Sequence, residues 1–283
     1  MRERRRRRVA YLLVLPGVLF LVVFFVLPMF TMLSTSFQEG TFETGFTFTG
    51  HWQNYADAFA ANDTQIYRSL IYGLIVTGTT LIISFPLAYW IAFRGGRRKN
   101  LYLLLLLLPF FTPFLIRTLA WKQILADNGI FLGTLKNAGL LADDFQILAT
   151  SGAVLGGLIY NFLPFMALPL YVALERLDHH LLDAASDLYS TRRQAFLKVT
   201  LPLALPGVLA GSLLTFIPAV GDFINSELLG STNTTMIGQV IQFEFQNAFD
   251  FPTGSALSFV LMSAILLGVF LYARALGTEE LTG

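Results

Sequence analysis

Residues 147–174 read ILATSGAVLGGLIYNFLPFMALPLYVAL, without a single Asp, Glu, Lys or Arg. The charged pairs Asp143-Asp144 and Glu175-Arg176 mark the two ends of the stretch. A transmembrane helix needs roughly 20 consecutive apolar residues. As a helix, the stretch also satisfies its own backbone hydrogen bonds inside a bilayer, where no water is available. We therefore predict a membrane-spanning helix here.

Five further stretches share this apolar character. They run from Val9 to Phe37, from about Leu70 to Phe93 and from Leu101 to Trp121, and two more start at Leu201 and at about Ser255. Of the 283 residues 55% are hydrophobic and only 13% are charged, whereas soluble domains carry about 25% charge. Continuous apolar runs favour helices over a transmembrane barrel, whose strands alternate in hydrophobicity. The sequence predicts an all-α polytopic membrane protein with six transmembrane helices.

The basic residues predict the orientation of these helices, because cytoplasmic loops are enriched in Lys and Arg. The side that would hold both termini carries 15 of the 19 basic residues, namely Arg2, Arg4 to Arg8, Arg94, Arg97, Arg98, Lys99, Arg176, Arg192, Arg193, Lys198 and Arg274. The loops on the other side are acidic or neutral. We expect a cytoplasmic basic N-terminus at 1–8, a six-helix membrane domain at 9–274 and a cytoplasmic tail at 275–283.

Several classes of function lack their sequence signatures. There is no cysteine for a disulfide or a thiolate site. No phosphate-binding loop of the form G-x-x-x-x-G-K-[ST] occurs, nor any metalloprotease, serine hydrolase or calcium-loop motif. His179 and Asp183 are four residues apart, but two candidate ligands on a polar helix indicate solvated residues rather than a metal site. The net charge of +1 gives no field that would attract nucleic acid. We expect no catalytic residue, no metal and no cofactor in this chain.

The connection at 176–200 is amphipathic rather than continuously apolar. Its first half carries one apolar stripe at helical spacing, formed by Leu181, Leu182, Ala185 and Leu188. Asp178 is a candidate N-cap, and Thr191 with Gln194 predicts a capping box for a second short helix that Pro202 would end. Such a hairpin can dock on another protein or pack on its own bundle and on lipid headgroups. The periodicity alone leaves both open.

Small residues recur at a spacing that lets membrane helices approach closely. The pairs are Gly152 with Gly156 and Gly207 with Gly211. Such pairs occur in helix packing within one chain and in contacts between subunits, and we expect one or the other here.

A resemblance to a known family rests on the same connection. The run Asp183-Ala184-Ala185-x3-Tyr189-x9-Val199-x-Leu201-Pro202 resembles the Glu-Ala-Ala-x3-Gly-x9-Ile-x-Leu-Pro signature of permease subunits in bacterial ABC importers. Asp183 replaces Glu, and Tyr189 replaces a Gly, which is unfavourable if the turn there needs a positive φ. The resemblance implies the type I importer permease (MetI-like) fold, a bacterial inner-membrane location and contact with an ATPase through Asp183, Ala184, Ala185, Tyr189, Leu201 and Pro202.

Three further segments resemble the spermidine/putrescine permeases of the PotB and PotH kind. They are LPFFTPFLIRTLAW at 108–121, LPFMALPLY at 163–171, and Gly221-Asp222-Phe223 followed by ELLG at 227–230. The resemblance implies a second permease subunit, two ATPase subunits that bind ATP, and an extracytoplasmic binding protein that delivers the polyamine. Importers of opines and aminophosphonates have related permeases, so they remain alternatives. An ion-coupled secondary transporter is less favoured, because the chain shows no inverted repeat.

A polyamine pathway needs carboxylates for ammonium groups and aromatic faces for cation–π contact. Charged residues near the membrane interior are functional candidates by default. The candidates for the substrate pathway are Trp121, Tyr160, Glu175, Asp222, Phe223 and Glu227.

Each candidate also has a structural interpretation. Glu175 can pair with Arg176, Trp121 can belong to an interfacial belt, and Asp222 can cap a helix. Arg117 does not suit a pathway for cations, and we expect it to form a structural ion pair with an acidic residue.

Overall fold

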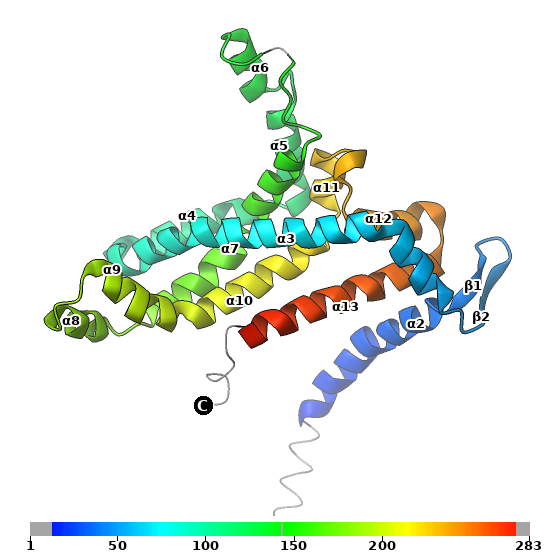
Figure 1. Cartoon of the computed structure of the whole chain (residues 1–283), viewed down its shortest axis with the longest axis horizontal. Coiled ribbons are helices and arrows are strands. Elements are labelled where there is room, and N and C mark those ends of the chain that lie inside the picture. Colours follow the sequence, from blue (N-terminus) through cyan, green and yellow to red (C-terminus); the bar gives the residue numbers. More distant parts are fainter. Residues whose placement is uncertain (1–12, 143, 276–283) are drawn as a thin grey trace, which may run out of the picture. The chain divides into compact units, whose positions relative to one another are not determined.

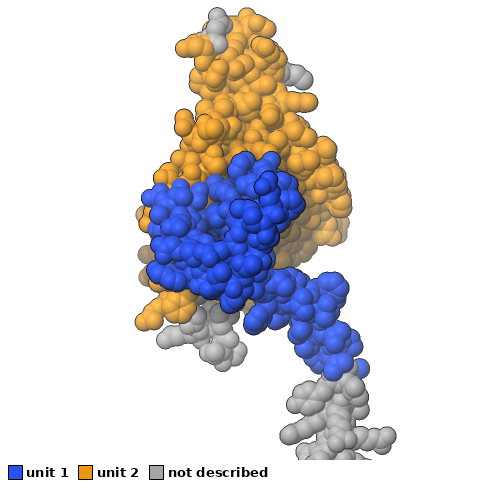
Figure 2. Space-filling model, turned by 90° about the vertical axis from the view of Figure 1, so that its right-hand side faces the viewer, with its two compact units in different colours: residues 1–63, 240–263 blue, residues 64–239, 264–283 orange. Residues whose placement is uncertain are grey.

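The structure, a computed structural model, describes residues 13–142 and 144–275. The basic N-terminus at 1–8, the start of the first apolar stretch, and the tail beyond 275 lie outside the described residues. The chain divides into two compact units (Figure 2), residues 1–63 with 240–263 and residues 64–239 with 264–283. Each unit is described by itself below.

The first unit joins the N-terminal helix to a small hairpin that the sequence did not predict. The helix runs over Leu13–Thr35 and includes the π-helical turn η1 (Val22–Val26) and α2 (Leu27–Thr35). Strands β1 (Gln38–Thr41) and β2 (Gly45–Phe48) pair antiparallel. Gly45, the first residue of β2, has a φ of +82°, which glycine adopts at no steric cost. Within the described residues, the fold is therefore all-α apart from this one short hairpin.

Aromatic rings hold this hairpin against the later part of the same unit. That part contains the end of α12 (Ile237–Phe243), the π-helical turn η6 (Glu244–Ala248) and the first half of α13 (Phe251–Ala275). The ring centroids of Phe42 and Phe249 lie 5.2 Å apart, and those of Phe46 and Phe251 lie 5.5 Å apart. Such pairs contribute about 0.5–1.5 kcal/mol each beyond their buried area.

The second unit contains most of the helices. They are the greater part of α3 (Gln53–Arg94), η2 (Gly96–Arg98), α4 (Lys99–Leu107), η3 (Leu108–Phe111), α5 (Phe114–Leu125), α6 (Ile130–Asn137), α7 (Ser151–Glu175), α8 (His179–Asp187), α9 (Arg192–Ala195), η4 (Phe196–Thr200), α10 (Leu201–Val220), α11 (Ile224–Leu229), η5 (Thr232–Thr234) and the end of α13. Figure 1 shows α7 and α10 running side by side, with α8 and α9 at one end of the pair.

The predicted spans are confirmed with one change of shape. Among the described residues, five helices are long and apolar enough to cross a membrane, at Leu13–Thr35, Gln53–Arg94, Ser151–Glu175, Arg192–Val220 and Phe251–Tyr272. The expected third span is not one straight helix, because Gly96–Phe111 and Phe114–Leu125 meet at 86°. The break coincides with Pro109 and Pro113, and proline removes backbone donors and bends helices. The bent pair counts as the sixth span if it crosses as one.

The expected end of the second hairpin helix at Pro202 is wrong. The helix continues from Arg192 through Pro202 to Val220. Pro202 occupies the first turn of α10, directly after the π-helical turn η4. A π-helical turn shifts the hydrogen-bond pattern, so the chain passes Pro202 without a break.

Glycines set the distance between α7 and α10. A methyl group on Gly207 would lie 2.5 Å from Ala173 Cβ and 2.8 Å from the Pro169 carbonyl oxygen. One on Gly211 would lie 2.8 Å from Met166 Sδ. The Gly207 and Gly211 pair therefore packs within the chain, as expected. Gly156 has no heavy atom within 4 Å of its Cβ position, so a subunit contact at Gly152 and Gly156 stays a prediction.

We predict that Gly207→Ala lowers the stability of the purified protein. The added methyl group has to push α7 away, and overpacking costs about 1–3 kcal/mol. The midpoint of thermal unfolding in detergent should fall. Gly156→Ala is the matched control, because it adds the same methyl group to open space. Equal midpoints for the two variants would show that α7 and α10 do not pack as closely as described.

Candidate functional site: a surface hairpin and a buried polar junction

Hydrogen bonds at both helix starts shape the hairpin formed by α8, α9 and η4. The backbone N–H of His180 donates to Asp178 Oδ1 at 2.9 Å, which confirms Asp178 as the cap of α8. The N–H of Gln194 donates to Thr191 Oγ1 at 3.3 Å, and Gln194 Oε1 accepts from the N–H of Thr191 at 2.9 Å. The predicted capping box is thereby confirmed.

The turn between α8 and α9 has the left-handed conformation that a glycine would favour. Tyr189 has a φ of +57°, and its side chain is 97% exposed. The N–H of Ser190 donates to the carbonyl of Ala185 at 3.1 Å and closes the end of α8. A non-glycine residue in this region costs of order 1 kcal/mol or more, and such strain clusters at functional positions.

The hairpin presents both polar and apolar groups at its surface. Asp183 and Ala184 are exposed and Ala185 is half-buried. Leu188 is 81% exposed, so the apolar stripe of α8 is not covered by the rest of the chain. Leu201 and Pro202 lie in the first turn of α10 and not in the hairpin itself. Leu181 of the apolar stripe of α8 is 47% exposed, whereas Leu182 and Ala185 of the same stripe are half-buried.

Phe196 anchors the hairpin to the membrane helices of the second unit. Its ring lies edge-on to Phe85 of α3, with centroids 5.5 Å apart, and 6.3 Å from the ring of Tyr89. The hairpin therefore contacts α3 through aromatic rings and continues into α10 as one helix.

A buried polar junction lies near the other end of α7 and α10. Asn161 Nδ2 of α7 donates to Asn225 Oδ1 of α11 at 3.1 Å and to Thr118 Oγ1 of α5 at 3.3 Å. The Asn225 N–H donates to Asp222 Oδ1 at 2.7 Å, and Asn225 Nδ2 donates to Asp222 Oδ2 at 3.1 Å. Asn161, Thr118 and Asn225 are fully buried. These hydrogen bonds join α5, α7 and α11. Separating the helices without water would leave the amide donors unpaired, which is costly in a dry interior.

Asp222 lies directly before Phe223, the N-cap residue of α11, and its carboxylate accepts a hydrogen bond from the first turn of that helix. Both of its oxygens accept hydrogen bonds from Asn225, and only 8% of the residue is exposed. Burial raises the pKa of its carboxyl from 3.8 to about 6, and the bonds from Asn225 and Ser226 oppose this rise. The geometry supports the capping interpretation, while contact with substrate stays a prediction.

The expected ion pair of Arg117 is wrong. Within the described residues Arg117 pairs with no carboxylate, and its buried Nε and Nη1 atoms have no hydrogen-bond partner. Its guanidinium lies instead over the ring of Phe110, 4.2 Å from the centroid, and 5.7 Å from that of Phe114. The bend between η3 and α5 brings these two rings together, which the sequence alone does not show. Cation–π contact with these rings stabilises the guanidinium charge of Arg117.

The structure brings some of the expected pathway residues together and separates others. The rings of Trp121 and Tyr160 meet edge-on with centroids 5.4 Å apart. Tyr160 precedes Asn161, which links through Asn225 to Asp222. Phe223 and Glu227 are exposed beside this junction.

Glu175 lies at the opposite end of α7 and belongs to a different contact. It pairs with Lys99 of α4 and not with Arg176. An ion pair with Lys99 links α4 to the end of α7, which is a structural use of this carboxylate.

The sequence analysis did not single out Asn161, Asn225 or Thr118. One signal was available for Asn161, because an amide inside an apolar stretch needs a hydrogen-bond partner. The identity of that partner could not be read from the chain.

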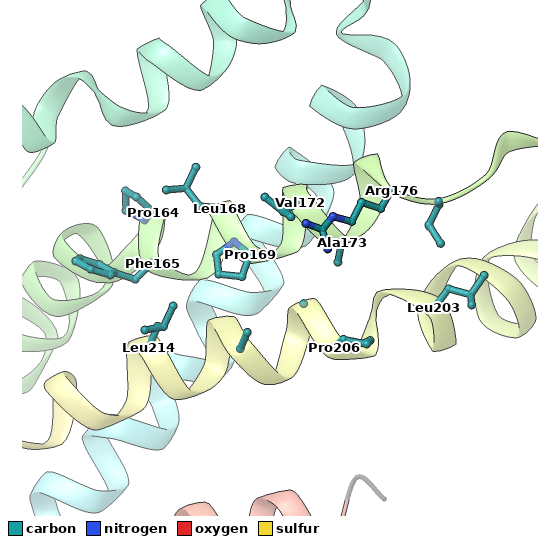
Figure 3. A pocket seen from close by; sticks show the side chains of 13 residues that line it. Pro164, Phe165, Leu168, Pro169, Val172, Ala173, Arg176, Leu203, Pro206 and Leu214 are labelled. Atoms are coloured by element: carbon teal, nitrogen blue, oxygen red, sulfur yellow. The ribbon is translucent and has the colours of Figure 1, made fainter. Parts of the chain in front are cut away.

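An apolar groove runs along α7 and α10. It has a volume of about 660 Å³. Figure 3 shows Pro164, Leu168 and Val172 on one wall and Pro206 and Leu214 on the other. Arg176 at the end of the groove is its one charged lining residue, and none of the six pathway candidates lines it.

Comparison with protein families places this geometry in context. Residues 84–276 match the family described as "Binding-protein-dependent transport system inner membrane component". The chain is 38% identical over 256 residues to the spermidine/putrescine transport system permease protein PotB of Haemophilus influenzae, which covers 90% of each chain. The protein of the same description from Escherichia coli is 38% identical over 210 residues, 74% of this chain and 76% of that one.

Solved structures share the fold at low sequence identity. A bacterial ABC transporter involved in the import of the acidic polysaccharide alginate superposes with a TM-score of 0.74 at 18% identity and covers 97% of both chains. The MetNI methionine ABC transporter gives a TM-score of 0.57 at 20% identity over 76% of this chain and 95% of that one. These likenesses show the fold.

The raised pKa of Asp222 predicts a pH-dependent stability. Between about pH 4 and pH 6 the folded state binds more protons at this carboxyl than the unfolded state, so its contribution to the free energy of unfolding falls as the pH rises, by about 3 kcal/mol. Asp222→Asn removes the titrating carboxyl and with it this pH-dependent contribution to the free energy of unfolding. From pH 4 to pH 7 the thermal midpoint of the wild type should therefore fall relative to that of the variant. Asp57→Asn, at an exposed carboxyl, is the control. If the difference between the thermal midpoints of wild type and Asp222→Asn does not change with pH, the raised pKa of Asp222 is contradicted.

Proposed function

Because the chain belongs to the family of binding-protein-dependent transport system inner membrane components, we propose that it forms half of the translocation pathway of an ATP-driven importer for polyamines. The observation that carries the substrate class is the 38% identity to a spermidine/putrescine permease along 90% of both chains. The proposed complex contains a second permease, two ATPase subunits that bind and hydrolyse ATP, and an extracytoplasmic binding protein.

The proposed orientation places the α8–α9 hairpin in the cytoplasm, with both termini on the same side. The concentration of Lys and Arg around this end supports it. The hairpin is then where the ATPase can bind. Asp183, Ala184, Ala185 and Tyr189 form the contact, since three of them are exposed at its surface and Ala185 lies between them at half burial. Leu201 and Pro202 pass the movement on to α10.

The proposed mechanism is alternating access driven through a mechanical contact. Closure of the ATPase dimer moves the hairpin, and the hairpin moves α10 directly and α3 through Phe196. Rigid-body rearrangement of packed helices then opens the pathway on one side and closes it on the other. The polar junction around Asn225 keeps α5, α7 and α11 together while this happens.

The substrate pathway is proposed to run past the polar junction. Trp121 and Tyr160 offer aromatic faces to a flexible polycation, and Glu227 offers an exposed carboxylate. Phe223 is exposed on the same connection. Asp222 contributes by holding this connection in shape, and Glu175 by holding α4 to α7.

Uptake in cells tests the proposed substrate. Cells that lack the gene should lose ATP-dependent accumulation of radiolabelled spermidine and putrescine, and restoring the gene should return it. An excess of unlabelled polyamine should compete, while amino acids, opines and phosphonates should not. Strains without a second polyamine importer remove redundancy. Unchanged polyamine uptake in such a strain would refute the substrate class, although not the family.

A charge reversal on the hairpin tests the proposed coupling. Asp183→Lys should lower copurification of the ATPase and reduce uptake at least tenfold, because it places a cation on the contact surface while the exposed position leaves the fold intact. Asp57→Lys makes the same change at an exposed site near the start of α3, on the side predicted to be extracytoplasmic. It should retain the ATPase. Normal copurification and uptake for Asp183→Lys would place the ATPase contact elsewhere.

A further inference from the structure

A small pocket lies within the α8–α9 hairpin itself. Its volume is about 440 Å³, within the ~300–1,000 Å³ typical of ligand sites. Ala185 and Ala195 form part of its apolar wall, and Ser190, Gln194 and Lys198 supply its polar groups. The pocket is separate from the groove between α7 and α10, and the substrate pathway does not use it.

The polar groups of this pocket can each donate a hydrogen bond, and the described residues supply no acceptor for the hydroxyl of Ser190. Ser190 Oγ is buried and has no hydrogen-bond partner. The capping box uses Gln194 Oε1 as an acceptor for Thr191 N–H, which leaves the side-chain NH₂ of Gln194 free to donate. The ammonium of Lys198 makes no ion pair with any described residue. A buried hydroxyl without a partner costs about 1–3 kcal/mol. The hydroxyl of Ser190 is in this state in the described structure.

The carboxylates of the described part of the chain do not line this pocket. Asp183 and Asp187 are the acidic residues of α8, and neither lines it. Asp178 is engaged at the start of α8 with the N–H of His180. Among residues 13–142 and 144–275, no carboxylate lines the pocket beside these three donors.

We propose that this pocket receives the carboxylate of an Asp or Glu side chain from the ATPase subunit. This inference rests on the proposed function and makes the contact reciprocal, since the hairpin inserts into the ATPase and the ATPase inserts an acidic side chain into the hairpin. The chemistry identifies the occupant. One cation and two neutral donors match an ionised carboxylate, because its oxygens only accept hydrogen bonds. Hydrogen bonds to a charged acceptor are also stronger than those between neutral groups.

The rim of the pocket strengthens the proposed ion pair. Leu188 and Tyr189 line the pocket and are 81% and 97% exposed. On docking, these side chains exclude water around the pair of charges, as the surroundings of an interface hot spot do. This also gives a use to the left-handed φ of Tyr189, since a glycine at the same place would leave the rim open.

Binding measurements on the intact permease pair test the inference. The pair is placed in phosphatidylcholine nanodiscs, and its affinity for the purified ATPase subunits is measured. Lys198→Gln should weaken binding about tenfold, the loss of one charge-assisted contact. Arg193→Gln is the matched control, because it removes one charge from an exposed hairpin position that does not line the pocket. It should change affinity by less than about twofold.

Ser190→Ala separates a contact role from a structural one. Because Ser190 Oγ has no partner among the described residues, this variant should leave the thermal midpoint of the permease unchanged or raise it, while weakening ATPase binding several-fold. A lower thermal midpoint with unchanged affinity would overturn the inference. Zero-length carbodiimide cross-linking of the wild-type complex should join Lys198 to an Asp or Glu of the ATPase. If the only cross-links between the hairpin and the ATPase involve the carboxylates of Asp183 or Asp187, and none involves Lys198, the inference is also overturned.

These outcomes distinguish a failure of the pocket assignment from a failure of the proposed function. If the wild-type permease binds the ATPase and Lys198→Gln behaves like Arg193→Gln, the pocket assignment fails and the proposed function stands. If the wild type binds no ATPase, both fail. If the effect of Lys198→Gln occurs only in nanodiscs that contain phosphatidylglycerol, the occupant is a lipid phosphate, and the assignment to the ATPase is overturned.

Discussion

The close packing of α7 against α10 is the constraint on which the second unit depends. Gly207 and Gly211 let the two helices approach until backbone and side chains touch, which is how membrane helices associate where no hydrophobic force drives them. The hairpin of α8 and α9 is the connection between these two helices, so its position follows from their distance. The polar junction lies further along the same pair, where Asn161 of α7 reaches Asn225 of α11. A change in the α7–α10 distance would therefore reach both features at once.

The sequence predicted features that depend on local chemistry. The apolar stretches predicted the spans, Asp178 and the Thr191–Gln194 pair predicted helix starts, and the family pattern at Tyr189 indicated a turn that favours glycine. Each depends on residues a few positions apart. Features that depend on distant residues were missed or misassigned. The partner of Glu175 is Lys99, on a helix far away in the sequence, and Arg117 stacks on Phe110 because of the 86° break. The passage of the helix through Pro202 depends on a π-helical turn that no local rule indicates.

The candidate site combines two kinds of chemistry that suit the two ends of a transporter. The hairpin is exposed, charged and shaped by caps, which suits binding to a soluble partner. The junction is buried, neutral in most of its members and joined by amides, which suits holding helices together in a medium without water. Trp121 and Tyr160 adjoin the junction and not the hairpin. Binding of substrate and use of ATP are thus proposed to lie at separate places that the α7–α10 pair connects.

The central claim is that ATP hydrolysis in the ATPase subunits, transmitted through the hairpin, drives polyamine transport through the membrane helices. Reconstitution tests it most directly, with both permeases and the ATPase in proteoliposomes, the binding protein and radiolabelled spermidine outside, and ATP inside. The account predicts accumulation that requires ATP, the binding protein and the ATPase together. Accumulation that follows an ion gradient in the absence of ATP and the ATPase would contradict it.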